Sequence, residues 1–132
     1  MLGIDTNVLV RYLVQDDAVQ TEKASRVIEN ECTSENPGFI NNIVLCELVW
    51  VLSRAYGYKK KDICSVLKRI FTCPEIMLEN SDAAWSAYYE YEKGSADFAD
   101  YLISHINKLN GANPTVTFDT GCKGMQHFRI IK

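Results

Sequence analysis

The first seven residues, Met1 to Asn7, constrain the fold more than any other stretch of the chain. A short apolar run ends at Asp5, and apolar residues at helical spacing begin directly afterwards with Val8 and Leu9. This pattern predicts a strand, a carboxylate at its carboxyl end, and then a helix. Ligands of open parallel sheets bind at the carboxyl ends of the strands. We therefore expect Asp5 to lie at a ligand-binding edge, with other acids supplied by the rest of the chain.

Strand-like and helical segments alternate along the chain. Helices are expected over residues 8–14, 19–30, 43–52, 59–71, 81–93 and 95–109, and further strands over 38–40, 75–79, 115–118 and 128–131. This alternation is typical of the α/β class, and right-handed crossovers place helices on both faces of the sheet. Because 132 residues are too few for two ordinary domains, we expect one domain over 1–132 with a mainly parallel five-stranded sheet.

Composition indicates the class of protein and its cellular compartment. The 47% hydrophobic and 23% charged residues are those of a soluble globular protein. No apolar run approaches the roughly 20 residues of a membrane helix, and nothing resembles a signal peptide, so we expect a cytoplasmic location and no membrane contact. Five cysteines without a C-x-x-C pair indicate free thiols and neither a disulfide framework nor a zinc site.

Five acidic residues are predicted to share one edge of the sheet. Helices of βαβ units run antiparallel to the strands, so helix N-termini lie beside the carboxyl ends of strands. Asp5 follows the first strand, and Glu47 lies early in the helix after the second. Asp97 and Asp100 begin a helix after the third strand, and Asp119 follows the fourth.

Most of these acids also have a purely structural interpretation. Asp5 has the position of a helix cap, Asp97 and Asp100 have the spacing of a capping box, and Asp119 suits a turn. Glu47 is the exception, because it is the only ionisable group in an apolar helical stretch. A buried, unpaired carboxylate is costly, so we expect Glu47 to be paired from elsewhere in the fold or bound to a metal.

Crowded carboxylates indicate a hard divalent cation. Such groups repel one another without a counter-ion, and Mg²⁺ and Mn²⁺ prefer oxygen ligands. His105 and His127 are expected at core or surface positions, which disfavours zinc or iron. A carboxylate-only site favours phosphodiester hydrolysis, in which a metal activates water. The net charge of −3 argues mildly against nucleic acid as a partner, but a cation offsets clustered acids.

The ordered set of acidic motifs resembles the PIN-domain nucleases, and among them the VapC-type toxins of type II toxin–antitoxin pairs. The resemblance covers essentially the whole chain and rests on Asp5-Thr6-Asn7, Glu47-Leu48, Asp97-Phe98-Ala99-Asp100 and Thr117-Phe118-Asp119. It implies an Mg²⁺- or Mn²⁺-dependent endoribonuclease with an RNA substrate, which forms a homodimer and is inhibited by a cognate antitoxin.

The resemblance also implies roles for individual residues. The acids that it makes catalytic metal ligands are Asp5, Glu47, Asp100 and Asp119, with Asp97 as a supporting ligand. The polar residues that it expects to orient the carboxylates are Thr6, Asn7 and Thr117. The tail from Gly121 to Gly124 departs from the family pattern.

Basic and aromatic residues supply candidates for RNA contact. Those expected at the RNA backbone are Arg11, Arg54 and Lys59, with a solvated helix face as the alternative. Tyr12 and Tyr56 are candidates to stack on bases, although core packing is the favoured interpretation. The apolar run around Trp50 exceeds what one helix face buries, which indicates a dimer or partner surface, or a position inside the core.

A non-catalytic α/β module is the main alternative, either a receiver-like regulatory domain or a degenerate PIN domain that binds RNA. A receiver requires paired acids after its first strand and a lysine after its last, whereas this chain has Asp5 alone and no lysine directly after Asp119. A phosphatase of the D-x-D type is disfavoured because Asn7 stands at the second acidic position. The presence of all four expected acids argues against a degenerate PIN domain.

Overall fold

The computed structural model describes residues 1–132 and divides the chain into two units, Met1–Ser81 and Asp82–Lys132. Six α-helices and parallel strand pairs alternate along the chain, which confirms the α/β class. No helix combines the length and the apolar character needed to cross a membrane. No disulfide bond joins any two of the five cysteines.

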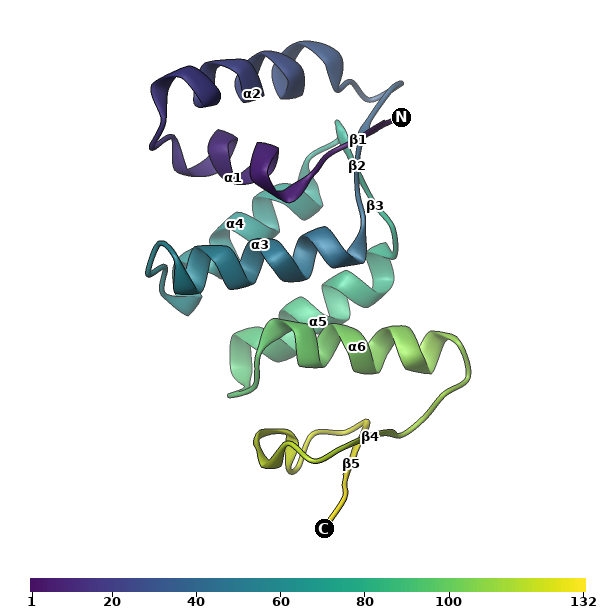
Figure 1. Cartoon of the computed structure of the whole chain (residues 1–132). Helices are drawn as coiled ribbons and strands as arrows, with labels where there is room; N and C mark the ends of the chain where they lie inside the picture. The colour runs from purple at the N-terminus through teal and green to yellow at the C-terminus, as the bar shows by residue number, and fades with distance from the viewer. The chain divides into compact units, whose positions relative to one another are not determined.

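The first unit is built from two successive strand–helix–helix segments and a third strand. Its elements are β1 (Leu2–Gly3), α1 (Thr6–Val14), α2 (Ala18–Glu31), β2 (Gly38–Ile40), α3 (Asn42–Arg54), α4 (Lys60–Thr72) and β3 (Ile76–Leu78). The three strands are parallel in the order β1-β2-β3. Figure 1 shows α1 and α2 side by side, joined by a short turn. The central strand starts at Gly38, where a Cβ atom would lie 2.9 Å from the Cys32 sulfur.

Side-chain caps explain where the helices of the first unit begin. The Asp17 carboxylate accepts a hydrogen bond from the Gln20 N–H (3.0 Å) at the start of α2. The Asn41 side chain accepts one from the Val44 N–H (2.9 Å) at the start of α3. These bonds satisfy backbone donors that the first helical turn leaves free. Because capping is a local interaction, the predicted helix starts lie close to the observed ones.

Periodic apolar residues form the core of the first unit. In α3, Leu45, Leu48 and Leu52 are completely buried. Their spacing of three and four residues places them on one side of the helix. Helix α4 likewise buries Ile63 and Leu67, and α1 buries Leu9 and Val10. The core therefore covers one side of α3, and the opposite side is exposed.

The second unit contains two helices and a strand pair. Its elements are α5 (Ser81–Lys93, whose first residue closes the first unit), α6 (Phe98–Leu109), β4 (Thr115–Thr117), the 3₁₀ helix η1 (Thr120–Cys122) and β5 (Phe128–Ile130). Phe98 is completely buried, with its ring edge-on to that of Tyr91 at 5.8 Å between centroids. Gly94 follows α5, where a Cβ would lie 1.8 Å from the Tyr101 hydroxyl oxygen. Only glycine fits this position without movement of the tyrosine.

The prediction of one five-stranded sheet is wrong. The strands form a parallel three-stranded sheet, β1-β2-β3, and a separate parallel pair, β4-β5. In the pair, Thr115 N–H donates to the His127 carbonyl and Ile131 N–H donates to the Thr117 carbonyl, both at 2.8 Å. Each strand has only two or three residues. Strands β1, β2 and β3 belong to the first unit and β4 and β5 to the second, and the ladder hydrogen bonds stay within each unit.

Candidate functional site

Asp5, Thr6 and Glu47 form a hydrogen-bonded group in the first unit. Asp5 follows β1 and caps α1, where its Oδ1 accepts a hydrogen bond from the Thr6 N–H at 2.7 Å. The Thr6 hydroxyl donates a hydrogen bond to Glu47 Oε1, also at 2.7 Å. Thr6 is only 8% exposed, so its side chain is held firmly between α1 and α3. One threonine therefore positions carboxylates that lie 42 residues apart in sequence.

The expectation that Glu47 is buried is wrong. Glu47 is exposed, whereas its neighbour Leu48 is completely buried. The apolar run that surrounds Glu47 in sequence covers more than one side of α3, and Glu47 lies on the side away from the core. Its expected partner from elsewhere in the fold is the Thr6 hydroxyl. Because Glu47 is exposed and only one of its oxygens accepts a hydrogen bond, it is available to a cation.

Asp97, Asp100 and Asp119 form the acidic group of the second unit. Asp100 lies in the first turn of α6 and accepts a hydrogen bond through Oδ2 from the Asp97 N–H at 3.3 Å. Asp119 Oδ1 accepts one from the Gly121 N–H at 2.8 Å, and the Asp119 N–H donates to the Thr117 hydroxyl oxygen at 3.0 Å. The capping and turn roles considered for these acids are therefore present in the structure.

Cys122 is a neighbour of these acids that the sequence pattern does not reveal. One ligand atom from each of Asp100, Asp119 and Cys122 lies within 4.8 Å of the others. The thiol is 1% exposed and belongs to η1, directly after the Asp119 turn. In sequence Cys122 looks like part of an irregular tail, and no local signal places it beside α6.

The electrostatics of this group favour a cation. Burial raises the pKa of Asp100, and the charges of Asp97 and Asp119 raise it further, while the Asp97 N–H acts in the opposite direction. Burial, and then the neighbouring carboxylates, raise the pKa of Cys122 to about 11. The thiol is therefore protonated at neutral pH and is a weak ligand in that form. Two carboxylates beside a neutral thiol suit Mg²⁺ or Mn²⁺ better than zinc.

The carboxylates keep oxygens available for a metal. In the structure, only one oxygen of each of Asp5, Glu47, Asp100 and Asp119 accepts a hydrogen bond from the protein. The second oxygen of each is unused. Capping and metal binding are thus compatible, because the capping bonds fix the orientation of a carboxylate whose other oxygen can bind a cation.

The two histidines are not part of either acidic group. The rings of His105 and His127 pack edge-on with centroids 5.6 Å apart, and His105 also contacts Glu90. His127 is buried and His105 is half-buried. These positions agree with the expected core or surface roles.

Arg11 is engaged in a network that links α1 to its surroundings. Its Nη1 donates to Asp16 at 2.9 Å and to the Tyr56 hydroxyl at 3.0 Å, and its Nε donates to Gln20 at 2.6 Å. The Tyr56 hydroxyl in turn donates to the other Asp16 oxygen at 2.8 Å. The Tyr56 hydrogen bond, with the Asp16 charge, raises the pKa of Arg11. These contacts give Arg11 and Tyr56 a clear structural role.

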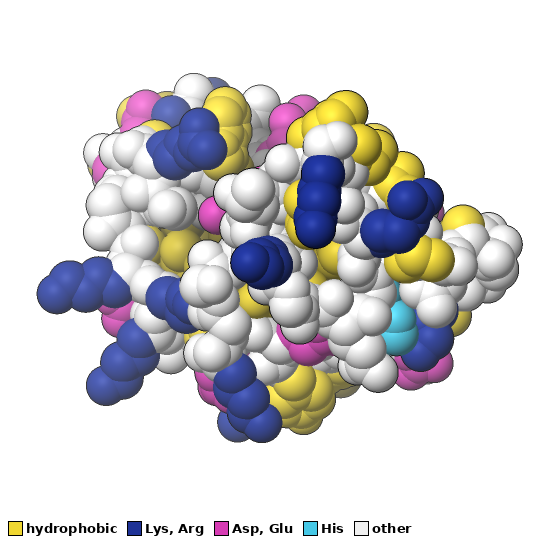
Figure 2. All heavy atoms as spheres, turned by 90° about the horizontal axis from the view of Figure 1, so that it is seen from below, with side chains coloured by type: hydrophobic (Ala, Val, Ile, Leu, Met, Phe, Trp, Pro, Cys, Tyr) yellow, Lys and Arg dark blue, Asp and Glu magenta, His cyan; other side chains and the backbone are white.

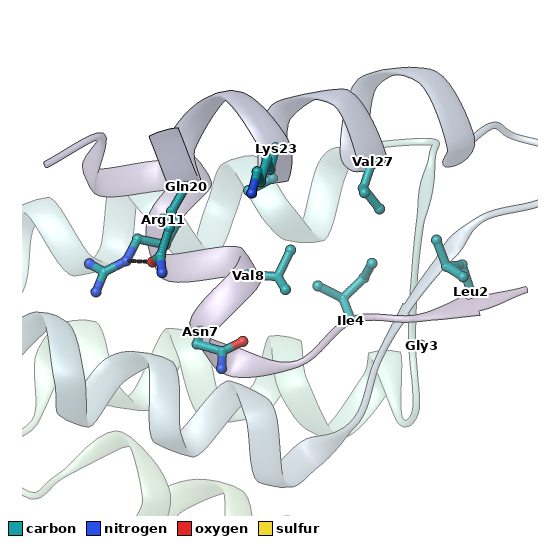
Figure 3. Close-up of a pocket in the computed structure, with 10 residues that line it drawn as sticks. Leu2, Gly3, Ile4, Asn7, Val8, Arg11, Gln20, Lys23 and Val27 are labelled. Atoms are coloured by element: carbon teal, nitrogen blue, oxygen red, sulfur yellow. Dashed lines mark hydrogen bonds between the residues drawn. The ribbon is translucent and has the colours of Figure 1, made fainter. Parts of the chain in front are cut away.

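A pocket of about 420 Å³ lies between β1, α1 and α2. In Figure 3, Ile4 and Val8 lie on one side of the pocket, and Lys23 and Val27 of α2 lie on the other. Asn7 also lines this pocket.

Two of the three polar residues expected to orient the carboxylates form hydrogen bonds with acidic residues. The Thr6 hydroxyl donates to the Glu47 carboxylate, and the Thr117 hydroxyl oxygen accepts from the backbone N–H of Asp119. Asn7 makes no hydrogen bond to an acidic residue.

The remaining predicted basic residues occupy different places on the first unit. The Arg54 guanidinium, at the end of α3, lies over the Trp50 ring at 4.8 Å from its centroid. Lys59 is exposed and directly precedes α4. On the face shown in Figure 2, lysine and arginine side chains stand as separate points among other side chains.

Comparison with known proteins gives one family match. A sequence model of the family described as PIN domain matches residues 3–127, which covers both acidic groups. No curated protein matches the chain.

Proposed function

The chain belongs to the PIN domain family, and from this premise we propose that it is a divalent-metal-dependent endoribonuclease that hydrolyses RNA phosphodiesters. PIN domains are generally metal-dependent nucleases. The observation that carries the proposal is the pair of oriented acidic groups, in which each capping bond leaves a carboxylate oxygen unused.

We propose that Mg²⁺ or Mn²⁺ is held by four carboxylates, with Asp97 in support: Asp5, Glu47, Asp100 and Asp119. When bound, such a cation activates water and neutralises charge on the scissile phosphate. The chain contributes orientation. Thr6 fixes Glu47 through its hydroxyl, and Thr117 fixes the turn that carries Asp119. Asn7 remains a candidate to orient Asp5 once metal and substrate are present.

Exposed basic residues are the candidates for contact with the RNA phosphates. Arg54 and Lys59 are exposed and form no ion pair with a carboxylate, so both are available to phosphates. Arg11 remains a weaker candidate, because Asp16 and Tyr56 already occupy its guanidinium. A few such contacts are enough to hold a single strand, and binding through them weakens as salt concentration rises.

We further propose that the protein is the toxin of a toxin–antitoxin pair, active as a homodimer and inhibited by a cognate antitoxin. The order of the acidic motifs supports this assignment. Large exposed apolar side chains, Leu109 and Phe118 among them, provide surface for protein partners. A small gene directly upstream that encodes a DNA-binding protein with an amphipathic tail is the expected companion.

Induced expression in bacteria tests this assignment. Wild-type protein is expected to arrest growth and cleave cellular RNA, and co-expression of the upstream gene is expected to restore growth. Glu47→Gln keeps the hydrogen-bond acceptor for Thr6 but removes the charge, so it is expected to fold and to be harmless. Growth arrest by a folded Glu47→Gln protein would refute the proposal.

A further inference from the structure

An exposed stripe runs along α3 beside the acidic group of the first unit. It contains Ile43, Glu47, Trp50 and Arg54, at spacings of four, three and four residues. Residues at these spacings lie on one side of a helix. Ile43 is 70% exposed and Trp50 is 56% exposed. A large aromatic ring left in solvent on this stripe has no role in the core.

Trp50 and Arg54 form a composite surface within reach of Glu47. With a rise of 1.5 Å per residue, Trp50 lies about 4.5 Å and Arg54 about 10.5 Å further along the helix axis than Glu47. The Arg54 guanidinium covers part of the indole at 4.8 Å from the ring centroid. No carboxylate forms an ion pair with Arg54, so its charge is not neutralised by the protein.

We propose that Trp50 and Arg54 form a site beside Glu47 that binds one unpaired nucleobase and its phosphate. Bases that are free of pairing stack on aromatic rings and on guanidinium planes. Arg54 adds a charged donor set suited to phosphate oxygens. In a duplex the base faces are stacked on one another and are not available to Trp50. The inference rests on the proposed function, because it uses Glu47 as a ligand of the catalytic metal.

The composition of the stripe favours RNA over a protein partner. An apolar protein interface would extend the hydrophobic surface around Trp50, but its neighbours along the stripe are the charged residues Glu47 and Arg54. Ile43 lies on the far side of Glu47 from Trp50. Trp50 lies between Arg54 and the candidate metal ligand Glu47. A base stacked on Trp50 would therefore lie close to a phosphate at the metal.

Tryptophan fluorescence can test this site directly, because the chain has only two tryptophans. The variant Trp85→Phe leaves Trp50 as the only source of tryptophan emission. Metal-free protein, kept in EDTA so that RNA stays intact, is titrated with a short single-stranded oligoadenylate and separately with an RNA duplex. We expect the single strand to quench Trp50 emission through stacking and the duplex to leave it nearly unchanged.

Matched variants separate stacking from charge and from general effects. Trp50→Ala is expected to weaken binding of oligoadenylate by roughly 5- to 150-fold, the range for loss of one stacked base. Trp50→Phe should retain much of the affinity. Arg54→Lys keeps the charge but loses the planar group, so an intermediate loss is expected. Tyr89→Ala is the control, since Tyr89 is similarly exposed at 54% but lies on α5.

The possible outcomes distinguish this inference from the proposed function. If wild-type protein cleaves RNA, but Trp50→Ala leaves KM unchanged and Trp50 emission does not respond, the inference fails and the nuclease assignment stands. If Trp50 emission is quenched by single strands but no divalent metal supports cleavage, the binding site stands and the nuclease assignment fails. If sedimentation shows that Trp50→Ala breaks up an oligomer without changing RNA affinity, the surface is a protein contact and the inference is overturned.

Discussion

Thr6 and Glu47 are joined by a hydrogen bond of 2.7 Å from the threonine hydroxyl to Oε1 of the carboxylate. The same Thr6 donates its backbone N–H to Asp5 at 2.7 Å. A single nearly buried residue at the start of α1 thus sets the orientation of two exposed acids, one that caps α1 and one within α3. The N–H and the hydroxyl of Thr6 both donate to carboxylates, so its contribution is positional.

Replacement of Thr6 by valine tests this positional role. Thr6→Val keeps the size and branching of the side chain but removes the hydroxyl, so Glu47 loses its partner. Loss of a residue that orients a metal ligand is expected to reduce kcat/KM on the order of 10- to 100-fold. Urea unfolding should show a loss of only about 1 kcal/mol. Thr6→Ser, which retains the hydroxyl, should keep near wild-type activity, and a Thr6→Val protein of full activity would contradict the role.

The ionised Asp100 side chain is expected to lower the stability of the folded protein while it serves as a metal ligand. Its folded-state pKa is raised by burial and by neighbouring acids, so the folded state favours the protonated form. The resulting stabilisation is complete below the ordinary pKa of 3.8 and is lost as pH rises through the higher folded-state pKa. At neutral pH the ionised group therefore costs stability.

Asp100→Asn should consequently raise the melting temperature of metal-free protein at neutral pH, while it abolishes cleavage. The difference from wild type should shrink as pH falls below the folded-state pKa of Asp100. Added Mn²⁺ should stabilise the wild type more than the variant. Calorimetry across a pH series in EDTA checks these expectations, and a lower melting temperature for Asp100→Asn at neutral pH would contradict them.

Cys122 is expected to be unreactive and dispensable for metal binding. Because its pKa is about 11, the thiolate needed for alkylation is scarce at neutral pH. Iodoacetamide followed by peptide mass mapping should leave Cys122 unmodified in the folded protein. Cys122→Ala should retain activity within a few-fold, and loss of Mn²⁺ affinity in this variant would instead make the sulfur a ligand.

The Tyr56–Asp16 contact predicts a pH-dependent contribution to stability. The hydrogen bond from Tyr56, together with the Arg11 charge, lowers the pKa of Asp16. A lowered folded-state pKa gives stabilisation that is present above the ordinary value of 3.8 and lost as pH falls through the folded value. Tyr56→Phe should therefore be less stable than wild type at neutral pH, and the gap should close in acid. An equal gap at every pH would show that the Asp16 charge is not involved.

Local signals account for the parts of this fold that the sequence predicts well. Asn41 and Asp17 cap helices through bonds that span only three residues, so their positions are visible in the chain itself. The buried positions of α3 follow its apolar periodicity. The helix expected from residue 95 begins at Phe98 instead, because Asp97 and Asp100 form their reciprocal cap only from there.

Non-local contacts account for what the sequence does not predict. Periodicity identifies Glu47 as a charge within an apolar run, but it does not show on which side of α3 that charge lies. The pairing of β4 with β5 depends on backbone bonds between short strands. Cys122 approaches Asp100 only because η1 folds back toward α6. Each of these features depends on segments that are distant in sequence.

The proposed metal-dependent ribonuclease activity is tested by the rate of cleavage of single-stranded RNA, measured while Mg²⁺ or Mn²⁺ is titrated into metal-free protein. We expect no cleavage in EDTA and a rate that rises to saturation with either metal. Asp5→Asn and Asp119→Asn, one variant from each unit, should fold as judged by circular dichroism and should lose the metal-dependent rate. Cleavage that is independent of divalent metal, or full activity in either folded variant, would contradict the account.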